Sequence, residues 1–509
     1  MSQPDVSGSI LARTAKGAGW IIAWRMLTRI LGTVSTLMLV RFLLPADFGV
    51  VALGVNFMQA VESLGFVGVE EALIREKAPE RDLYDTGFTL NVLRGLAMAL
   101  VLAGAAIPAG GFFGDPRLAN VLLALALGTL IEGATNIGTV DFRRDFAFHR
   151  ELLLLILPRL ASIALMVGMA VLWQTYWALV AGILSMRVLK VAMSYRMHPY
   201  RPRLTLRARR ALLGYSLWTW AVSMAAVARE RSNALLIGRM LDPMRVGVFS
   251  VGADLASLPT TELVVPLSRA AFSGFSAARH TGESMAETYL RVVSSTALLT
   301  LPMGIGLSLV ADPLVRLAFG DAWLDAVPVV RILGLSGAAA VFDYIGWTLF
   351  FAHAQLSTVF RVTCLSAVVR VLLLLVLLPH FGLIGAAVAT LVSVSAEAVC
   401  YLGLIFHHLD LSPGALLRRI WRCLLASAVM VLALVPAGLG WVAVPAPPAE
   451  LALHLLEAVL AGALAYSATL LLAWYCSGRP AGAEADALGA AKKLWRRIGG
   501  SGRPPYSAG

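Results

Sequence analysis

The sequence has little charge: only 14% of its 509 residues are Asp, Glu, Lys or Arg, against 59% hydrophobic residues and a mean hydropathy of +0.78. Soluble domains are usually about one quarter charged and about half apolar. No polar stretch is long enough to build a separate soluble domain. This scarcity excludes a soluble enzyme with a single anchor and indicates a chain that lies mostly within a bilayer.

Cysteines and chemical motifs are also scarce. Four scattered cysteines without C-x-x-C spacing predict neither a disulfide framework nor a metal site. A G-x-x-x-x-G-K-[ST] phosphate loop and a Ser/His/Asp arrangement are missing, so we expect no ATP hydrolysis by this chain, no enzyme activity and no cofactor. The net charge of +12 does not require a nucleic-acid partner, because a basic excess is expected on the cytoplasmic loops of membrane proteins.

Fourteen apolar runs are present, each close to the roughly 20 residues that a helix needs to cross a bilayer. They are 19–41, 46–68, 84–108, 119–140, 151–173, 175–195, 211–238, 244–268, 286–310, 326–350, 356–378, 382–405, 420–442 and 450–475. A barrel would need short alternating strands instead. We predict an all-α polytopic membrane protein with about fourteen transmembrane helices, while interruptions by Gly, Pro and charge leave twelve or thirteen open.

Basic residues gather in every second connection and at both termini. The connection between the sixth and seventh runs is the most basic, with Arg196, Arg201, Arg203, Arg207, Arg209 and Arg210. The positive-inside rule then places both termini in the cytoplasm, which requires an even number of spans. Because the first 18 residues are polar and carry no signal-peptide pattern, we expect the first apolar run to be a resident helix.

The chain also repeats itself at an offset of 198 residues. Arg41, Leu43, Pro45, Gly49 and Gly54 recur as Arg239, Leu241, Pro243, Gly247 and Gly252. The offset covers six spans, so both copies have one orientation, as in transporters with two six-helix halves. We predict an N-terminal lobe (1–198), a C-terminal lobe (199–410), two further helices (411–478) and a basic cytoplasmic tail (479–509).

Polar side chains inside the apolar runs are the candidate functional residues, since charge in lipid is costly and normally faces a cavity or a partner. The first run carries Arg25 and Arg29 on one face. The second carries Asn56, Gln59 and Glu62 at helical spacing, and the repeat-related runs carry Arg229, Glu230, Arg231, Asn233 and Asp254. We predict that these four helices turn polar stripes toward a shared central cavity, although an internal Glu230–Arg ion pair that fixes packing is an alternative for the seventh run.

Clustered arginines favour an anionic substrate, because guanidinium donors match phosphate oxygens in pairs and stay charged. A lipid diphosphate is one such anion. We predict that Arg25, Arg29, Asn56, Gln59, Arg229, Arg231, Asn233 and Asp254 line the substrate cavity. Glu62, Glu132 and Asp343 are candidates for ion coupling, although a buried acid paired with an arginine explains Glu132 and Asp343 equally well.

The segment Leu39–Ala52, LVRFLLPADFGVVA, resembles the opening hairpin of polysaccharide transporter (Wzx-like) flippases. Gly65–Arg75 and the motif Tyr84-Asp85-Thr86-Gly87-Phe88 are similar to the second-to-third helix region of the same family. That family belongs to the multidrug/oligosaccharidyl-lipid/polysaccharide exporter superfamily. The local resemblance covers residues 15–95 of this chain.

The resemblance implies a flippase of undecaprenyl-diphosphate-linked oligosaccharides in a bacterial inner membrane. It would serve exopolysaccharide, capsule or O-antigen assembly by alternating access around an arginine-lined cavity. Its partners would be the lipid-linked oligosaccharide, membrane lipids, and a polysaccharide polymerase and export complex.

Three alternatives stay open. A cation-coupled drug or metabolite antiporter of the same fold would favour acidic cavity residues. A membrane polysaccharide polymerase or ligase would need a large external loop, which the short outer connections disfavour. A scaffold subunit would leave the buried charges without a purpose.

Overall fold

The computed structural model describes residues 27–28, 31–65, 69–76, 79–145, 147–209, 217–259, 264, 267–268, 271–272, 274–275, 284–480 and 482–489. These residues form helices and connections, and none of them is in a β-strand. Contacts divide the chain into two compact units, and each is described by itself. Unit 1 comprises residues 1–251, 318–325 and 371–386, and unit 2 comprises residues 252–317, 326–370 and 387–509.

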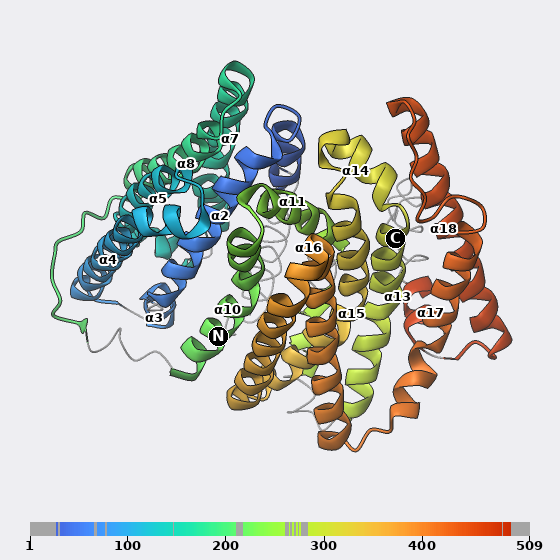
Figure 1. Ribbon diagram of the computed structural model, residues 1–509. Coiled ribbons are helices and arrows are strands. Elements are labelled where there is room, and N and C mark those ends of the chain that lie inside the picture. Colours follow the sequence, from blue (N-terminus) through green and yellow to red (C-terminus); the bar gives the residue numbers. More distant parts are fainter. Residues whose placement is uncertain are drawn as a thin grey trace, which may run out of the picture. The chain divides into compact units, whose positions relative to one another are not determined.

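Unit 1 contains the long helices of the first half of the chain. Their bounds are α2 (Pro45–Leu64), α3 (Val69–Arg75), α4 (Arg81–Phe113), α5 (Arg117–Gly133), η1 (Ile137–Val140), α6 (Asp141–Arg144), α7 (Phe148–Trp173), α8 (Trp177–Met197) and α10 (Leu217–Met240). Residues 31–39 are also helical. α4 packs on α5, α5 on α8, and α7 on α8, while α2 lies against both α5 and α10 (Figure 1). α2 is thus the central helix of unit 1.

The repeated turns begin their helices in the same way. Pro45 starts α2 and Pro243 starts α11 (Pro243–Pro259), where proline suits the first helical turn because its missing N–H would have no partner there. The two turns also touch each other. A Cβ on Gly49 would lie 1.8 Å from the carbonyl oxygen of Pro243, and a Cβ on Gly247 would lie 2.4 Å from that of Pro45. Gly49 corresponds to Gly247 in the repeat, and Pro45 corresponds to Pro243, so the two contacts are equivalent. Such reciprocal contacts are expected of two units related by a two-fold axis.

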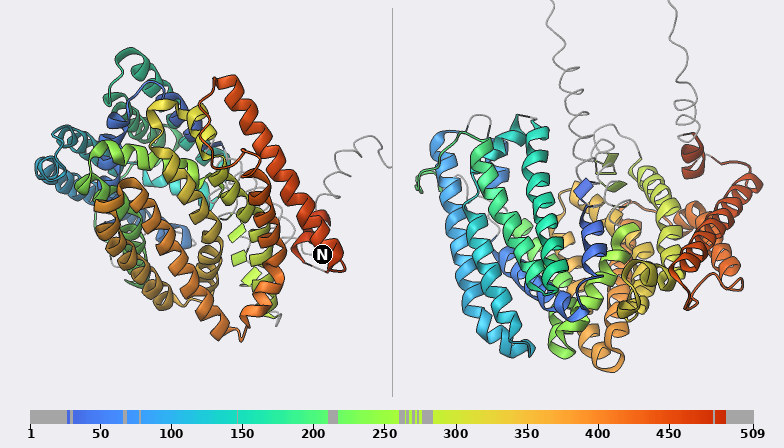
Figure 2. Two further views of the ribbon diagram at one scale, coloured as in Figure 1. Left: turned by 45° about the vertical axis from the view of Figure 1, so that its right-hand side comes forward. Right: turned by 90° about the horizontal axis from the view of Figure 1, so that it is seen from above.

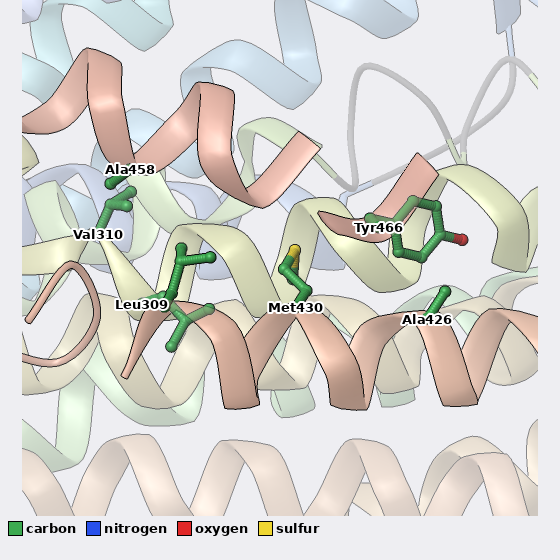
Figure 3. Close-up of a cluster of buried hydrophobic side chains, with 7 residues drawn as sticks. Leu309, Val310, Ala426, Met430, Ala458 and Tyr466 are labelled. Atoms are coloured by element: carbon green, nitrogen blue, oxygen red, sulfur yellow. The ribbon is translucent and has the colours of Figure 1, made fainter. Parts of the chain in front are cut away.

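Unit 2 contains α13 (Met285–Leu309), α14 (Ala311–Phe319), α15 (Ala326–Ala352), α17 (Pro413–Leu434), α18 (Pro448–Cys476) and most of α16 (Leu356–His408). α13 packs on α15 and α17, and α17 packs on α18, as Figures 1 and 2 show. Figure 3 shows the apolar side chains between α13, α17 and α18: Leu309, Val310, Ala426, Met430, Leu434, Ala458 and Tyr466. The Tyr466 hydroxyl donates to the carbonyl of Leu298 at 2.8 Å, so its one polar atom is satisfied in this apolar cluster.

The predicted division between the runs 356–378 and 382–405 lies within α16. Gly382 has φ +56° and ψ −134°, which breaks the helical backbone and which an L side chain would rarely adopt. The helix α14 was not predicted. It is short and amphipathic, and its Asp312 and Arg316 form an ion pair at 2.9 Å one turn apart.

The helical membrane fold is confirmed, and each of the fourteen predicted runs overlaps helix in the part of the chain that the structure describes. Seven described helices are long and apolar enough to cross a bilayer, and α5 together with the bent segment Ile137–Arg144 is an eighth candidate. α16 counts once although Gly382 divides it. The total of fourteen spans stays a prediction, as do the bounds of the four predicted domains. The helices with the predicted polar stripes, α2, α10 and α11, are not among the seven.

Candidate functional site

The polar stripe of α2 meets the polar stripe of α10 inside unit 1. Arg231 Nη1 donates to Asn56 Oδ1 at 3.0 Å, and Asn56 Nδ2 donates to the carbonyl of Ala52 at 2.8 Å. The asparagine therefore presents its amide oxygen to the arginine while its own donor is engaged on the preceding turn. Two residues that the sequence analysis assigned to one cavity, 175 positions apart, are thus in direct contact.

The guanidinium of Arg231 is not fully satisfied by this contact. Its Nε is buried and has no hydrogen-bond partner among the described residues, and Arg231 itself is only partly exposed. A charged group with an unmet donor in an apolar helix bundle is expensive. Such a donor is available for an anionic oxygen of a bound molecule.

A second polar cluster lies six residues further along α2, where Glu62 faces α5 and α8. Arg187 of α8 donates to Glu62 Oε1 at 3.2 Å and to Thr129 Oγ1 of α5 at 3.0 Å. The Thr129 hydroxyl in turn donates to the same Glu62 oxygen at 2.9 Å. The Arg187 side chain is 10% exposed, so this ion pair is largely withdrawn from solvent.

Glu132 extends this cluster. Its Oε1 accepts from Lys190 Nζ at 2.9 Å, and its Oε2 lies 3.4 Å from Arg187 Nε. Glu62, Thr129, Glu132, Arg187 and Lys190, here called the α2–α8 network, therefore contain two acids and two bases, each with a partner. Glu132 and Lys190 also line a polar pocket of about 290 Å³ together with Asn91, Arg94, Arg143 and Glu151.

The remaining predicted residues fall into three groups. Arg25 and Arg29 lie outside the described residues. Gln59 and Arg229 in unit 1 are partly buried, and Asn233 is buried. Asp254 is exposed and Asp343 is buried, and both belong to unit 2.

A further arginine approaches residues 31–39, a helical stretch within the first apolar run. A Cβ on Gly32 would lie 2.8 Å from Arg159 Nη2 of α7. Gly32 shares its helix face with Thr28 and Thr36, the stripe on which the sequence places Arg25 and Arg29. The missing side chain at Gly32 makes the room for this guanidinium.

Arg187, Lys190 and Thr129 were not predicted as site residues. A signal for two of them exists, because Arg187 and Lys190 are one turn apart within the apolar run 175–195 and so share a helix face. Thr129 gives no such signal, since a threonine inside a helix most often bonds to its own preceding turn.

An apolar cavity of about 560 Å³ lies in unit 2 between α13, α17 and α18. Leucines, valines, methionines and small residues line this cavity. Tyr466 and Ser467 are the only described lining residues with a polar side-chain atom. This chemistry suits hydrocarbon and offers nothing to a charged headgroup.

Comparison with known proteins adds three findings. A family model described as "Polysaccharide biosynthesis protein" matches residues 38–328. The succinoglycan biosynthesis transport protein ExoT of Rhizobium meliloti (strain 1021) is 26% identical over 341 residues, covering 65% of this chain and 67% of that protein. The lipopolysaccharide biosynthesis protein WzxC of Escherichia coli (strain K12) is 21% identical over 333 residues, covering 65% of this chain and 68% of that protein.

Solved structures agree on the fold. The lipid II flippase MurJ in an inward closed conformation superposes with a TM-score of 0.73 at 14% identity, covering 90% of this chain and 99% of that one. A multidrug resistance MATE family transporter in an inward-facing conformation gives a TM-score of 0.61 at 17% identity, covering 77% and 96%. These likenesses show a transporter fold built of transmembrane helices.

Proposed function

Since this chain belongs to the polysaccharide biosynthesis protein family, we propose that it is a flippase that moves undecaprenyl-diphosphate-linked oligosaccharide across a bacterial inner membrane. The similarity to a succinoglycan biosynthesis transport protein and to a lipopolysaccharide biosynthesis protein, together with the MurJ-like fold, supports transport of a lipid-linked precursor. The lipid chain would stay in the bilayer while the charged headgroup crosses through a polar cavity.

The observation that carries this proposal is the unsatisfied guanidinium of Arg231 beside Asn56. Its buried Nε–H has no partner among the described residues and, in this proposal, donates to a diphosphate oxygen once the cavity opens to the headgroup. The adjacent Asn56 and Gln59 offer amide groups of the kind that bind sugar hydroxyls. Arg25, Arg29, Arg229 and Asn233 complete the proposed cavity set of unit 1. Asp254, which belongs to unit 2, stays a cavity residue predicted from the sequence alone. An arginine is suited to this role, because its charge persists at any pH at which the cell lives.

The direction of transport needs a driving force, and three acids are candidates for ion coupling. Glu62 forms an ion pair with Arg187, and Glu132 forms one with Lys190. Asp343 is buried on α15, where a carboxylate inside a spanning helix is costly, and it is our first choice. In this proposal both termini are cytoplasmic, and a polysaccharide polymerase and export complex receive the flipped product.

The test is flipping by the purified chain in sealed proteoliposomes that contain a polyprenyl-diphosphate oligosaccharide, with headgroup exposure followed by an external glycosidase. Arg231→Ala should lower the flipping rate roughly tenfold to hundredfold, the value of one hydrogen bond to a charged group. Arg361→Ala is the matched control, since Arg361 is exposed and donates to Ser357 O of its own helix at 3.2 Å. Wild-type flipping by Arg231→Ala at equal protein incorporation contradicts the assignment.

A cation antiporter of the same fold is the competing function. It predicts no glycosidase-sensitive transfer by the wild-type chain under any imposed ion gradient, together with uptake of a cationic substrate.

A further inference from the structure

The connection between α8 and α10 contains an extended, ordered segment, residues 198–209, here called the strap. Its backbone is hydrogen-bonded to the first turns of α4. Arg203 N donates to Asp85 Oδ1 at 2.8 Å, Thr205 N to Thr89 Oγ1 at 2.9 Å, and Ala208 N to Thr86 Oγ1 at 3.1 Å. The strap is therefore fixed mainly through its main chain, and the Arg201 side chain also donates to the carbonyls of His198 and Tyr200.

The acceptors are buried in unit 1. Asp85 is 3% exposed, Thr86 is 0% and Thr89 is 7%, so the cost of burying them is met by the strap's N–H groups. Tyr200 strengthens the attachment: its hydroxyl donates to Asp85, and its carbonyl accepts from Asn136 Nδ2 at 2.8 Å. Burial and the bond to Asp85 raise the pKa of Tyr200, which keeps this hydroxyl a donor at physiological pH.

The outward side of the strap is basic and apolar. Arg201, Arg203, Arg207 and Arg209 are all exposed, and Leu204 and Leu206 are exposed between them, Leu204 by 73%. Arg207 has one acidic neighbour, Asp82, at a distance of 4.0 Å. The fixed backbone of the strap keeps Leu204 and Leu206 from turning inward. Packing within unit 1 therefore does not explain why these leucines are exposed between arginines.

The position of the strap along α4 places it at the level of lipid headgroups. From Gly95 to Phe113, α4 carries no charged residue, and this stretch measures roughly 28 Å, one hydrocarbon thickness. Asp85 and Thr89 lie roughly 8–14 Å beyond Arg94, the charged edge of that stretch. Arginine side chains at that height extend into the headgroup layer.

From these observations we propose that the strap is a binding surface for anionic phospholipids. The four arginines contact lipid phosphates, and Leu204 and Leu206 enter the upper acyl region. A basic cluster directly beside a spanning helix is the usual arrangement for this kind of contact. The alternation of Arg with Leu favours lipid over an acidic protein. Lipid offers phosphates to the arginines and acyl chains to the leucines, whereas an acidic surface pairs with the arginines alone.

The experiment places a spin label at Leu204→Cys in full-length protein whose four native cysteines are replaced by alanine. The protein is reconstituted in nanodiscs of phosphatidylcholine alone or with increasing phosphatidylglycerol. Accessibility of the label to oxygen and to a water-soluble nickel complex reports its depth. This readout needs neither flipping activity nor knowledge of which side of the membrane is cytoplasmic, so it fails or succeeds independently of the proposed function.

Phosphatidylglycerol should move the label from water into the lipid. Replacing all four strap arginines by Gln should abolish the shift, and each single Arg→Gln should weaken the response about fivefold. The backbone bonds to Asp85, Thr86 and Thr89 do not use these side chains, so the variant keeps the strap in place. A control with Lys492, Lys493, Arg496 and Arg497 changed to Gln removes the same charge elsewhere and should keep the shift.

Four outcomes overturn the proposal. The label stays equally aqueous at every phosphatidylglycerol content, or the four-Gln variant responds as the parent protein does. Inorganic phosphate added to phosphatidylcholine nanodiscs produces the same change, which identifies a free-anion site. Poly-glutamate immobilises the label while phosphatidylglycerol does not, which identifies an acidic protein as the partner.

Discussion

α2 carries two polar clusters that look alike in the sequence and differ in the structure. Asn56 and Glu62 are six residues apart on the helix that lies at the centre of unit 1. Asn56 meets one arginine, whose Nε is left without a partner among the described residues. Glu62 belongs to a network in which both acids and both bases are paired.

The difference separates two uses of charge within a membrane. A network with every group paired holds α2, α5 and α8 together, and removing one member exposes the others to the cost of an uncompensated charge. A buried guanidinium whose donor has no partner lowers the stability of the protein, and binding of a ligand oxygen removes that cost. Binding sites commonly contain such groups. Stability measurements and flipping measurements should therefore respond to different residues.

The largest effect on stability is expected from Arg187→Ala. It leaves Glu62 without its ion-pair partner and Glu132 with Lys190 alone, which should lower the free energy of unfolding by about 3 kcal/mol. Thermal unfolding in detergent measures this as a clear fall in melting temperature. Adding Glu62→Gln should restore part of the loss. An unchanged melting temperature would show that the α2–α8 network does not hold the helices.

The next effect concerns transport. Arg231→Lys keeps the charge and removes the planar fork, so we expect about a tenfold fall in flipping rate with an unaltered melting temperature. Parallel flipping and unfolding assays on the same preparation provide the comparison. Equal loss in both assays would mean that Arg231 serves packing, and full activity would mean that charge alone suffices.

Glu132→Gln tests whether the closed network also couples ions. The neutral amide still accepts from Lys190, so we expect a stability loss of about 1 kcal/mol and an unchanged dependence of flipping on an imposed proton gradient. Asp343→Asn, by contrast, should abolish that dependence. Loss of gradient dependence in Glu132→Gln would move the coupling role to unit 1.

The smallest effect is expected from Asn56→Ala, which removes one acceptor from Arg231 and leaves its charge. The flipping rate should fall by roughly fivefold, the worth of one hydrogen bond. Thr129→Val is the matched change in the other cluster and should alter stability without altering flipping. A reversal of these two results would break the distinction between the clusters.

Much of the fold was open to prediction because its causes are local. Pro45 and Pro243 start helices, and Gly382 breaks one. The repeat of Gly49 as Gly247 was visible in the sequence, but only the structure shows why glycine is needed: each backbone comes too close to the other for a Cβ. The motif Tyr84–Phe88 likewise predicted a family, and the structure shows that its Asp85 and Thr86 hold the strap.

The site was predicted only in part. The polar stripes on α2 and α10 follow from helical spacing. Asn56 and Arg231, which the sequence assigns to one cavity, are in contact, and their role in a cavity stays a prediction. Arg187 and Lys190 were missed, because two basic residues near the end of an apolar run also suit an interface. Helical spacing identifies which residues share a face and carries no information about which helix that face meets.

The sequence by itself determined that the chain lies in a membrane, where its helices form and break, and that it repeats. Composition and turn residues decide these features because they act over a few positions. The tertiary structure alone decided that Glu62 pairs with Arg187 across 125 positions and that Trp323 donates to Val40 O at 3.3 Å across 283 positions. It also decided that Arg231 Nε has no hydrogen-bond partner among the described residues. Those contacts depend on how whole helices pack, and packing minimises unpaired charge over the bundle and not along the chain.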